Sequence, residues 1–187
     1  LADYQMLVMP GGFSYGDDLG AGRLWASDLA HLLQDQVTPF VEAGMPVIGI
    51  CNGFQTMVRL GLLPGLDGDY RTPRATLAPN DRLGYRNAWV RLAFDPGSPC
   101  VWTRGLEAMD LPSRHGEGKF LAQDDATLDA VRDNDQVVFR YVDAEGEAGR
   151  PYPINPNGSV DDIAGICDTT GRVLGLMPHP ERHVLPT

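Results

Sequence analysis

The stretch PVIGICNGFQTMVRLGLLPG, residues 46–65, decides the fold. Residues 47–50 are apolar or glycine and predict a short buried strand, and residues 52–60 predict a helix closed by a glycine. Cys51 therefore occupies the corner between a strand and a helix. Glycines stand two residues before and two residues after it, which is the G-x-nucleophile-x-G spacing of a nucleophile elbow with cysteine in place of serine. The alternative is a small apolar cysteine in a core.

Such a corner favours nucleophilic chemistry for two physical reasons. It presents the side chain at the carboxyl edge of the sheet, where open α/β folds bind ligands. The N-terminus of the following helix also offers backbone N–H groups to a developing oxyanion and lowers the pKa of a thiol. We therefore expect an activated thiol at Cys51.

The rest of the N-terminal region predicts an α/β fold. A strand is predicted over 6–10, followed by a glycine-rich loop, and apolar spacings of three and four predict a helix over 23–43 whose last turn Pro39 breaks or kinks. The first 60 residues thus alternate strand, helix, strand, helix, which is typical of an open, mostly parallel sheet flanked by helices. Further strands are predicted over 88–94, 136–142, 163–168 and 173–177, a short helix over 124–132 and a loop over 64–84.

Composition restricts the classes of function. The 187 residues fit one domain spanning 1–187, and the net charge of −10 argues against nucleic-acid binding, which needs a basic surface. No apolar run reaches the length of a membrane-spanning helix, so we expect no membrane contact. The three cysteines have no CxxC spacing, and their odd number argues against a disulfide scaffold. We therefore infer a reducing compartment and predict a cytoplasmic protein.

A reactive thiol needs a base, and His179 is the best of the four histidines. It directly follows the strand predicted over 173–177, so it also lies at the carboxyl end of a strand. Glu181 is two residues further on, so in an extended segment both side chains point to the same side. A carboxylate beside an imidazole fixes its tautomer and stabilises the imidazolium. The alternative is a loop histidine with a surface glutamate; His31 and His183 have no comparable context.

Five sequence blocks then carry a family resemblance. GICNGFQ (49–55) and PHPE (178–181) resemble the class I, or triad, glutamine amidotransferases. Three further blocks narrow the resemblance to the glutaminase component of phosphoribosylformylglycinamidine synthase, and the match spans residues 5–183; these blocks are PGGFSYGD (10–17), HGEGKF (115–120) and NPNGS (155–159).

The resemblance implies a reaction and its partners. Cys51 would be the nucleophile, His179 the base and Glu181 its orienter, and a glutamyl thioester would form with release of ammonia. The ammonia would pass to a synthetase component, a separate subunit or a fused domain, that uses ATP to convert formylglycinamide ribonucleotide to formylglycinamidine ribonucleotide in purine biosynthesis. No phosphate-binding P-loop is visible, so no cofactor is expected on this chain, and ATP and Mg²⁺ are expected on the synthetase. A small accessory subunit is a further candidate partner.

The blocks also supply candidate substrate-binding residues. Backbone N–H groups of Gly11, Gly12 and Asn52 are candidates for the oxyanion site. Gln55, one helical turn after the thiol, is a candidate for holding the amino-acid end of glutamine, with a plain helical glutamine as the alternative. The remaining candidates are Phe13, His115 and Gly116; for His115 a structural or interface role is favoured over direct chemistry, and a metal site has no third ligand beside His115 and Glu117.

Departures from the family pattern leave alternatives open. The family's N-terminal strand and the helix after its PHPE block have no counterpart here, so we expect a sheet without its first strand and a domain truncated at both ends. Another class I amidotransferase, a cysteine hydrolase and a catalytically silent docking fragment remain as alternatives. Cys100 and Cys167 are predicted to be packing residues.

Overall fold

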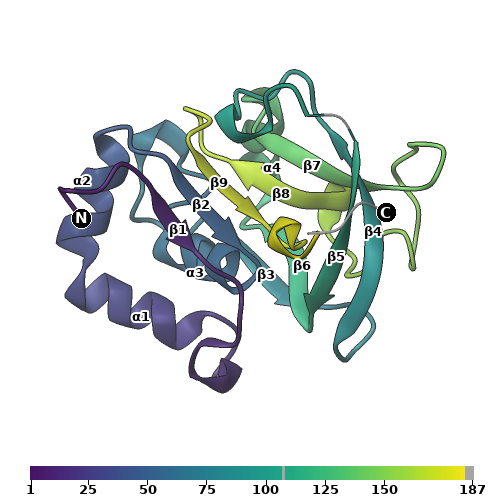
Figure 1. Cartoon of the computed structure of the whole chain (residues 1–187), viewed down its shortest axis with the longest axis horizontal. Helices are drawn as coiled ribbons and strands as arrows, with labels where there is room; N and C mark the ends of the chain where they lie inside the picture. Colours follow the sequence, from purple (N-terminus) through teal and green to yellow (C-terminus); the bar gives the residue numbers. More distant parts are fainter. Residues whose placement is uncertain (107, 184–187) are drawn as a thin grey trace.

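A seven-stranded sheet forms the centre of the computed structural model, which describes residues 1–106 and 108–183 (Figure 1). The strand order is β1-β2-β9-β8-β7-β4-β5, and β3 and β6 pair separately as a two-stranded sheet. The strands are β1 (Leu7–Met9), β2 (Val47–Ile50), β3 (Ala75–Pro79), β4 (Arg86–Phe94), β5 (Met109–His115), β6 (Glu117–Ala122), β7 (Val137–Val142), β8 (Ile163–Cys167) and β9 (Val173–Leu176). The α-helices are α1 (Arg23–Leu32), α2 (Gln34–Glu42), α3 (Asn52–Leu60) and α4 (Asp125–Asp133).

The α/β fold class is confirmed, but the sheet is mixed, so the expectation of a mostly parallel sheet is wrong. Among the described strands of this sheet, only β1, β2 and β9 pair in parallel. The pairs β9–β8, β8–β7, β7–β4 and β4–β5 are antiparallel. A parallel pair needs a long crossover, as α1 and α2 provide between β1 and β2. The later strands have shorter connections, such as the turn between β8 and β9. The absence of a first strand beside β1 stays a prediction.

Three local expectations need correction. The helix predicted over 23–43 is two helices, and the break lies at Leu33, which has φ −132°, while Pro39 is accommodated inside α2. The loop predicted over 64–84 contains β3. The strands β5 and β6 were not predicted, because Pro112 and the glycines of the HGEGKF block interrupt their alternating pattern.

Helix α3 lies directly against the sheet because the sheet carries glycines beneath it. Gly49 of β2 and Gly175 of β9 are register partners, and a Cβ on either would overlap a side chain of α3: Met57 at Gly49 and Phe54 at Gly175. Both of these α3 side chains are fully buried. The close approach fixes the N-terminus of α3 against the carboxyl ends of β2 and β9, which sets the position of the site described below.

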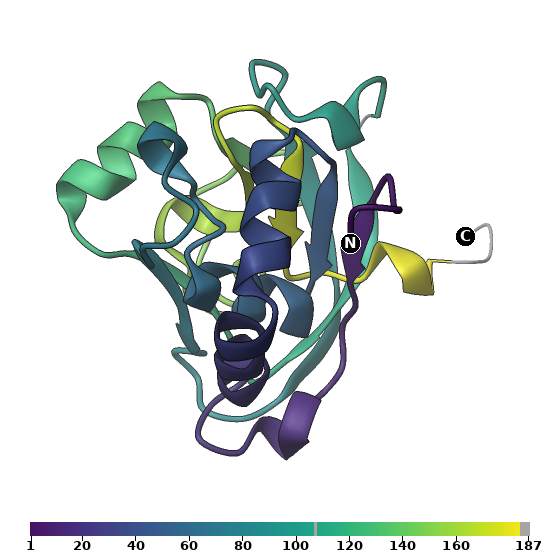
Figure 2. The same cartoon turned by 90° about the vertical axis from the view of Figure 1, so that its left-hand side faces the viewer.

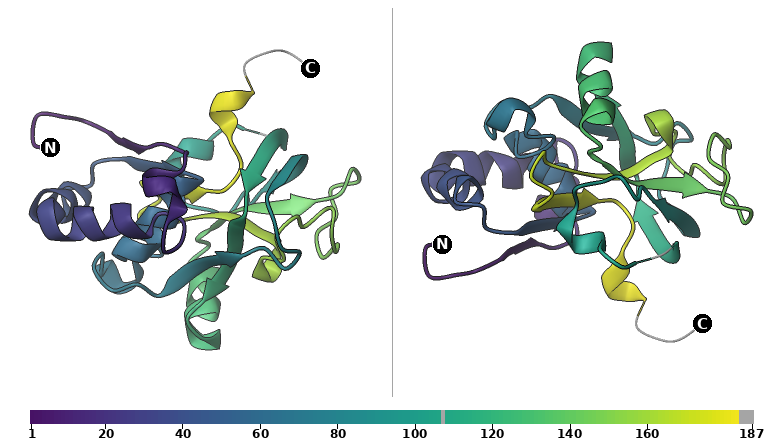
Figure 3. Two further views of the ribbon diagram at one scale, coloured as in Figure 1. Left: turned by 90° about the horizontal axis from the view of Figure 1, so that it is seen from below. Right: turned by 90° about the horizontal axis from the view of Figure 1, so that it is seen from above.

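The remaining helices complete the layers. Helix α1 packs against α3, and α1 and α2 lie nearest the viewer in Figure 2. Helix α4 and the short 3-10 helix Pro180–Arg182 lie on opposite sides of the sheet (Figure 3). Among the described residues, no helix has the length and apolar character needed to cross a membrane.

Candidate active site

Cys51 stands on a strained elbow whose flanking glycines have a steric cause. Its backbone has φ 49° and ψ −105°, a conformation that residues other than glycine rarely adopt. A Cβ at Gly53 would overlap the carbonyl oxygen of Met9 in β1, so the chain after the thiol passes too close to the neighbouring strand for any side chain. The Cys51 N–H donates to Leu176 O of β9 at 2.8 Å, which ties the elbow to the sheet. The predicted elbow is present.

The predicted base and its orienter lie beside the elbow. His179 Nδ1 is 2.7 Å from Glu181 Oε1, and the His179 backbone N–H donates to Pro112 O at 2.8 Å. The other ring nitrogen, Nε2, is buried and has no hydrogen-bond partner within the described part of the chain. A buried polar atom without a partner is unfavourable, and a catalytic role is one explanation for it.

Gly11 shows how closely Cys51 and His179 approach one another. A Cβ built on Gly11 would lie 2.8 Å from His179 Cε1 and 3.5 Å from Cys51 Cβ. The first distance is shorter than packing allows, so only glycine fits between the glycine-rich loop and the imidazole. Cys51, His179 and Glu181 are therefore gathered at the carboxyl ends of β2 and β9, as the sequence predicted.

The expectation of a lowered thiol pKa is wrong for the protein in this state. Burial raises the pKa of Cys51 to about 12, and the nearby carboxylates of Asp17 and Glu181 act in the same direction. The N–H of Asn52 at the start of α3 does lower the pKa, as expected, but desolvation is the larger effect. The thiol is protonated at neutral pH, so it needs a base to become a nucleophile.

Two of the predicted substrate-binding residues face open space. A Cβ at Gly12 or at Gly116 would meet no atom within 4 Å, and Gly12 has φ +146°. Phe13 follows in the same loop with 61% of its surface exposed, and its ring lies 6.0 Å from that of Tyr85. The roles of Gly12, Phe13 and Gly116 in binding substrate stay predictions.

Asn52 and Gln55 are buried and bonded to the protein itself. Asn52 Oδ1 accepts from the Ser14 N–H at 3.2 Å, which joins the glycine-rich loop to α3, and Asn52 Nδ2 donates to Gln55 Oε1 at 3.0 Å. Gln55 Nε2 donates to the carbonyl oxygen of Glu117. With both ends of its amide engaged, Gln55 positions β6 against α3, and direct contact with glutamine stays a prediction.

His115 is likewise satisfied inside the protein. It is 2% exposed, and its ring nitrogens lie 2.8 Å from Ser113 Oγ and 3.2 Å from Asn80 Oδ1. Burial and the neighbouring His179 lower the pKa of His115 to about 4, so the ring is neutral at physiological pH. This arrangement fits the structural role favoured from the sequence.

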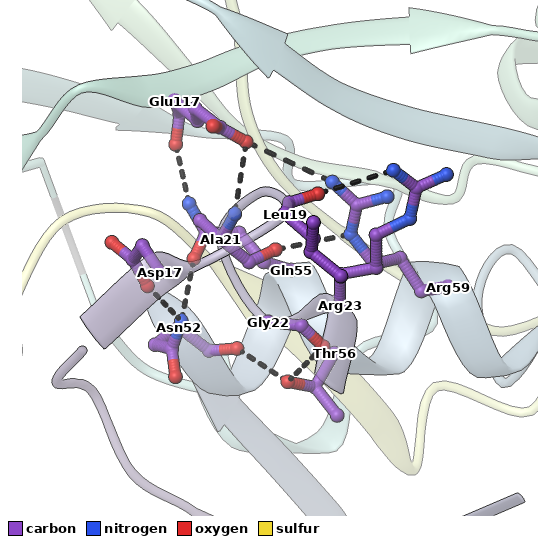
Figure 4. A network of polar contacts seen from close by, with 10 residues as sticks. All are labelled: Asp17, Leu19, Ala21, Gly22, Arg23, Asn52, Gln55, Thr56, Arg59 and Glu117. Carbon is purple, nitrogen blue, oxygen red and sulfur yellow. Dashed lines mark hydrogen bonds and ion pairs between the residues drawn. The ribbon is translucent and has the colours of Figure 1, made fainter. Parts of the chain in front are cut away.

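A polar network beside the elbow brings in functional candidates that the sequence did not single out (Figure 4). Glu117 accepts from the Ala21 N–H at 3.2 Å and pairs with Arg59 of α3 at 3.7 Å. Asp17 lies 3.4 Å from Asn52 Nδ2, and burial together with Glu117 raises its pKa. Asp17 and Glu117 lie within the recognised blocks, and Arg59 is one helical turn after Gln55, so helical spacing was the available signal.

The NPNGS block (155–159) anchors the strand that carries Glu117. Asn157 Nδ2 donates to Gly118 O at 2.9 Å, and the Ser159 hydroxyl accepts from the Phe120 N–H at 2.9 Å. These side chains replace a neighbouring strand for the backbone of β6. The block therefore has a positioning role that the sequence alone did not assign.

The other polar candidates lie outside this site. His31 is exposed on α1, and the His183 ring packs edge-on against Trp89 at 5.5 Å. Within residues 1–106 and 108–183, no three His, Cys, Asp or Glu side chains form a group that could hold a metal ion. Cys100 and Cys167 are buried, as predicted, at the other end of the sheet.

The comparisons with known proteins agree with this geometry. A family model described as the CobB/CobQ-like glutamine amidotransferase domain matches residues 1–187. The chain is 46% identical over 183 residues to phosphoribosylformylglycinamidine synthase subunit PurQ of Methanococcus maripaludis, covering 97% of this chain and 66% of that protein. It is 46% identical over 197 residues to the subunit of the same name from Treponema denticola, covering 98% and 73%.

A solved structure extends the likeness to the fold. The structure of PurLQS from Thermotoga maritima includes a chain that matches with a TM-score of 0.73 and 33% identity, covering 99% of this chain and 73% of that one. The chain thus spans about two thirds of the length of the first curated relative. Because the matched relatives are named as subunits of one synthase, the alternative reading as another amidotransferase or hydrolase is not favoured.

Proposed function

The chain belongs to the CobB/CobQ-like glutamine amidotransferase domain family, and from that premise we propose that it is the glutaminase component of a phosphoribosylformylglycinamidine synthase. In this role it hydrolyses glutamine to glutamate and supplies the ammonia to a synthetase component. The observation that carries the proposal is the single cluster of Cys51, His179 and Glu181, in which one imidazole nitrogen is bonded to the carboxylate and the other is buried and free to accept a proton.

The first half of the reaction forms a thioester. His179 Nε2 accepts the proton of the Cys51 thiol, and the sulfur attacks the side-chain amide carbon of glutamine. The carbonyl oxygen gains negative charge, and the proposed donors to it are the N–H of Asn52 at the start of α3 and the N–H groups of Gly11 and Gly12 in the glycine-rich loop. His179 then returns the proton to the leaving nitrogen, so ammonia departs and a glutamyl thioester remains.

The second half regenerates the thiol. His179 accepts a proton from a water molecule that attacks the thioester carbon, and the Cys51 sulfur leaves and recovers that proton. Glu181, bonded to Nδ1 at 2.7 Å, holds the imidazole orientation and stabilises its positive charge in both halves. The sum of the steps is glutamine plus water giving glutamate plus ammonia.

The ammonia needs an acceptor on another component. The proposed acceptor is a synthetase, as a separate subunit or a fused domain, that converts formylglycinamide ribonucleotide to formylglycinamidine ribonucleotide with ATP and Mg²⁺ bound there. The names of the matched relatives support this partner, and a small accessory subunit completes the proposed assembly. We place the reaction in the cytoplasm, which the three free cysteines support.

A glutamine-mimicking electrophile tests the proposal. The chain, alone and with its synthetase component, is exposed to a diazo-ketone analogue of glutamine, and the modified residue is mapped by mass spectrometry. We expect one adduct, on Cys51, that glutamine suppresses and that glutamate suppresses less. In parallel, Cys51→Ala should abolish glutamine-dependent synthesis and leave synthesis from free ammonium unchanged.

A matched control separates specific labelling from general thiol reactivity. Cys100→Ala removes a buried thiol outside the site and should leave both labelling of Cys51 and glutamine-dependent synthesis at wild-type levels. Labelling of Cys51 that glutamine does not reduce, in the presence of the synthetase, would contradict the proposed glutamine site. Loss of ammonium-dependent synthesis in Cys51→Ala would instead indicate a structural role for the thiol.

A further inference from the structure

Asp17 is a carboxylate near the proposed nucleophile that the steps of glutamine hydrolysis do not use. It lies in the glycine-rich loop, and its Oδ1 is 3.4 Å from Nδ2 of Asn52, the residue that follows Cys51 (Figure 4). Its negative charge opposes the formation of a thiolate at Cys51. An acid in this position therefore works against the nucleophile unless a cation accompanies it.

The described part of the chain supplies no such cation to Asp17. The neighbouring acid, Glu117, pairs with Arg59 at 3.7 Å, whereas Asp17 forms no ion pair with any described residue. Burial and the charge of Glu117 raise the pKa of Asp17, so the ionised carboxylate is in an unfavourable environment. A cationic group on a ligand would make that environment favourable.

The loop that carries Asp17 is anchored on both sides of it. Before Asp17, the Ser14 N–H donates to Asn52 Oδ1 of α3 at 3.2 Å. After it, the Ala21 N–H donates to Glu117 Oε2 of β6 at 3.2 Å. Asp17 itself has φ 57°, a left-handed conformation that aspartate and asparagine adopt more readily than most residues. The carboxylate is thus held in a defined position by contacts with two regular elements.

A separate observation points to a ligand beside this loop. His179 is 4% exposed, and its Nε2 is buried without a hydrogen-bond partner among the described residues. The adjacent ring carbon, Cε1, lies 2.8 Å from the position of a Cβ on Gly11 in the glycine-rich loop, and that position is 3.5 Å from Cys51 Cβ. Ser14 Oγ, in the same loop, is likewise buried without a partner in the described part of the chain. In the proposed reaction, the amide group of glutamine binds between the imidazole and the thiol.

Glutamine carries a cation close to its reacting amide. Three carbon atoms separate the amide carbon, which the sulfur attacks, from the α-nitrogen, which is an ammonium group at neutral pH. When the amide is in place, the α-ammonium group must therefore bind within a few ångströms of Cys51. Asp17 is bonded to the residue next to the thiol, so its carboxylate lies within that short reach. The α-carboxylate of the substrate is repelled by Asp17, which also fixes the orientation of the amino-acid end.

We propose that the Asp17 carboxylate binds the α-ammonium group of glutamine and makes the site specific for an α-amino acid. This inference rests on the proposed glutaminase function and deepens it. The contact gives Asp17 a partner and cancels the charge that opposes the thiolate, so the correct substrate removes an obstacle to its own reaction. Glu117 is a positioning residue, because its carboxylate holds the end of the loop that carries Asp17. Amides that lack the α-amino group leave Asp17 unpaired and react more slowly.

The test removes each partner of the contact in turn. The chain with its synthetase component is given L-glutamine or glutaramate, which is glutamine without its α-amino group, and ammonia release is measured for both. Wild type should prefer glutamine by at least about 10-fold in kcat/KM, the effect of one hydrogen bond to a charged group. In Asp17→Asn, which keeps the side-chain size and the left-handed backbone, kcat/KM for glutamine should fall by about the same factor. Activity on glutaramate should not fall, because that substrate has no group for Asp17 to bind.

Two further variants serve as controls. Asp18 is the next residue and is exposed, so Asp18→Asn should keep the wild-type preference for glutamine. Asp17→Glu keeps the negative charge and should retain more of the preference than Asp17→Asn does.

Two results would overturn the proposal and leave the glutaminase function standing. One is an equal loss of activity on both substrates in Asp17→Asn, which would indicate a structural role for the carboxylate. The other is a wild-type protein that hydrolyses glutaramate as well as glutamine, a comparison that needs no variant to fold. A wild-type protein that releases no ammonia from glutamine would instead overturn the glutaminase function itself, and the ammonium site with it.

Discussion

Strain at the elbow leads to a prediction that compares two buried cysteines. Cys51 has φ 49° and ψ −105°, whereas Cys100 has an ordinary extended conformation with φ −54° and ψ 118°. Four variants are needed: Cys51→Ala, Cys51→Gly, Cys100→Ala and Cys100→Gly. All four lack the thiol, so the difference between alanine and glycine at each position isolates the backbone conformation from the chemistry of sulfur.

The expected magnitude follows from three contributions. Replacing alanine by glycine at an unstrained buried position costs about 0.4–1 kcal/mol through the freer unfolded chain and about 0.8 kcal/mol for the lost methyl group. At Cys100 both costs apply in full. At Cys51 glycine also relieves a backbone strain of about 1–3 kcal/mol. The glycine penalty should therefore be smaller at Cys51 than at Cys100 by about 1–3 kcal/mol.

Urea unfolding at equilibrium measures this difference. The four variants are unfolded in reducing buffer and followed by far-UV circular dichroism. Their free energies of unfolding are compared with one common m value, the slope of the free energy of unfolding against urea concentration. If alanine-to-glycine exchange costs the same at both positions within about 0.5 kcal/mol, the elbow stores no strain and the reasoning fails. Both Cys51 variants should lack glutamine-dependent activity, whatever their stability.

Three further predictions rest on other contacts. Gly53→Ala should lower the free energy of unfolding by about 2 kcal/mol or more, because its Cβ meets the Met9 carbonyl, whereas Gly116→Ala should change it by less than about 0.5 kcal/mol; urea titration compares them. The pKa of His115 is about 4 in the folded protein and about 6.5 in the unfolded chain, so its contribution to stability is complete above pH 6.5 and is lost as the pH falls toward 4. Urea unfolding of the wild type and of His115→Gln across that window should show that the free energy of unfolding falls less steeply with pH in the variant. Glu181→Gln keeps a hydrogen bond to the imidazole but loses the charge, so kcat should fall about 100-fold with little change in KM, and an unchanged kcat would remove Glu181 from the triad.

The parts of the fold that could be predicted are those set by local pattern. Strand β2, helix α3 and their junction at Cys51 follow from a short apolar run, a helical spacing and a terminal glycine. The antiparallel pairing of β4 with β7 could not be predicted, because it joins strands far apart in the sequence and depends on which strand is the neighbour in space. Strand β5 depends on pairing with β4, and β6 depends on pairing with β3 and on side chains of the NPNGS block; the local sequence pattern reveals none of these contacts.

The candidate site divides in the same way. The triad could be predicted because two strand ends and an i, i+2 pair bring Cys51, His179 and Glu181 together. The pKa of the thiol could not, because it depends on how completely water is removed from Cys51, and burial outweighs the helix N-terminus. The hydrogen bond from Gln55 to the Glu117 carbonyl oxygen could not be predicted either, because Glu117 lies on a strand that was not predicted.

The raised pKa of Cys51 and the free Nε2 of His179 together define how this site must work. A thiolate standing permanently in the site would need positive charge to hold it. Arg182 acts in that direction, but burial and the carboxylates of Asp17 and Glu181 oppose it and raise the pKa of Cys51. The resting pair is therefore a neutral thiol beside an imidazole. The proton moves from the thiol to the imidazole only as the sulfur attacks the substrate, and the free-energy cost of separating the charges arises in that step. Glu181 reduces that cost by stabilising the imidazolium, and the N–H groups at the start of α3 reduce it by receiving the oxyanion. Reactivity in this site is consequently conditional on a correctly placed substrate, because only then does the transferred negative charge have a place to reside.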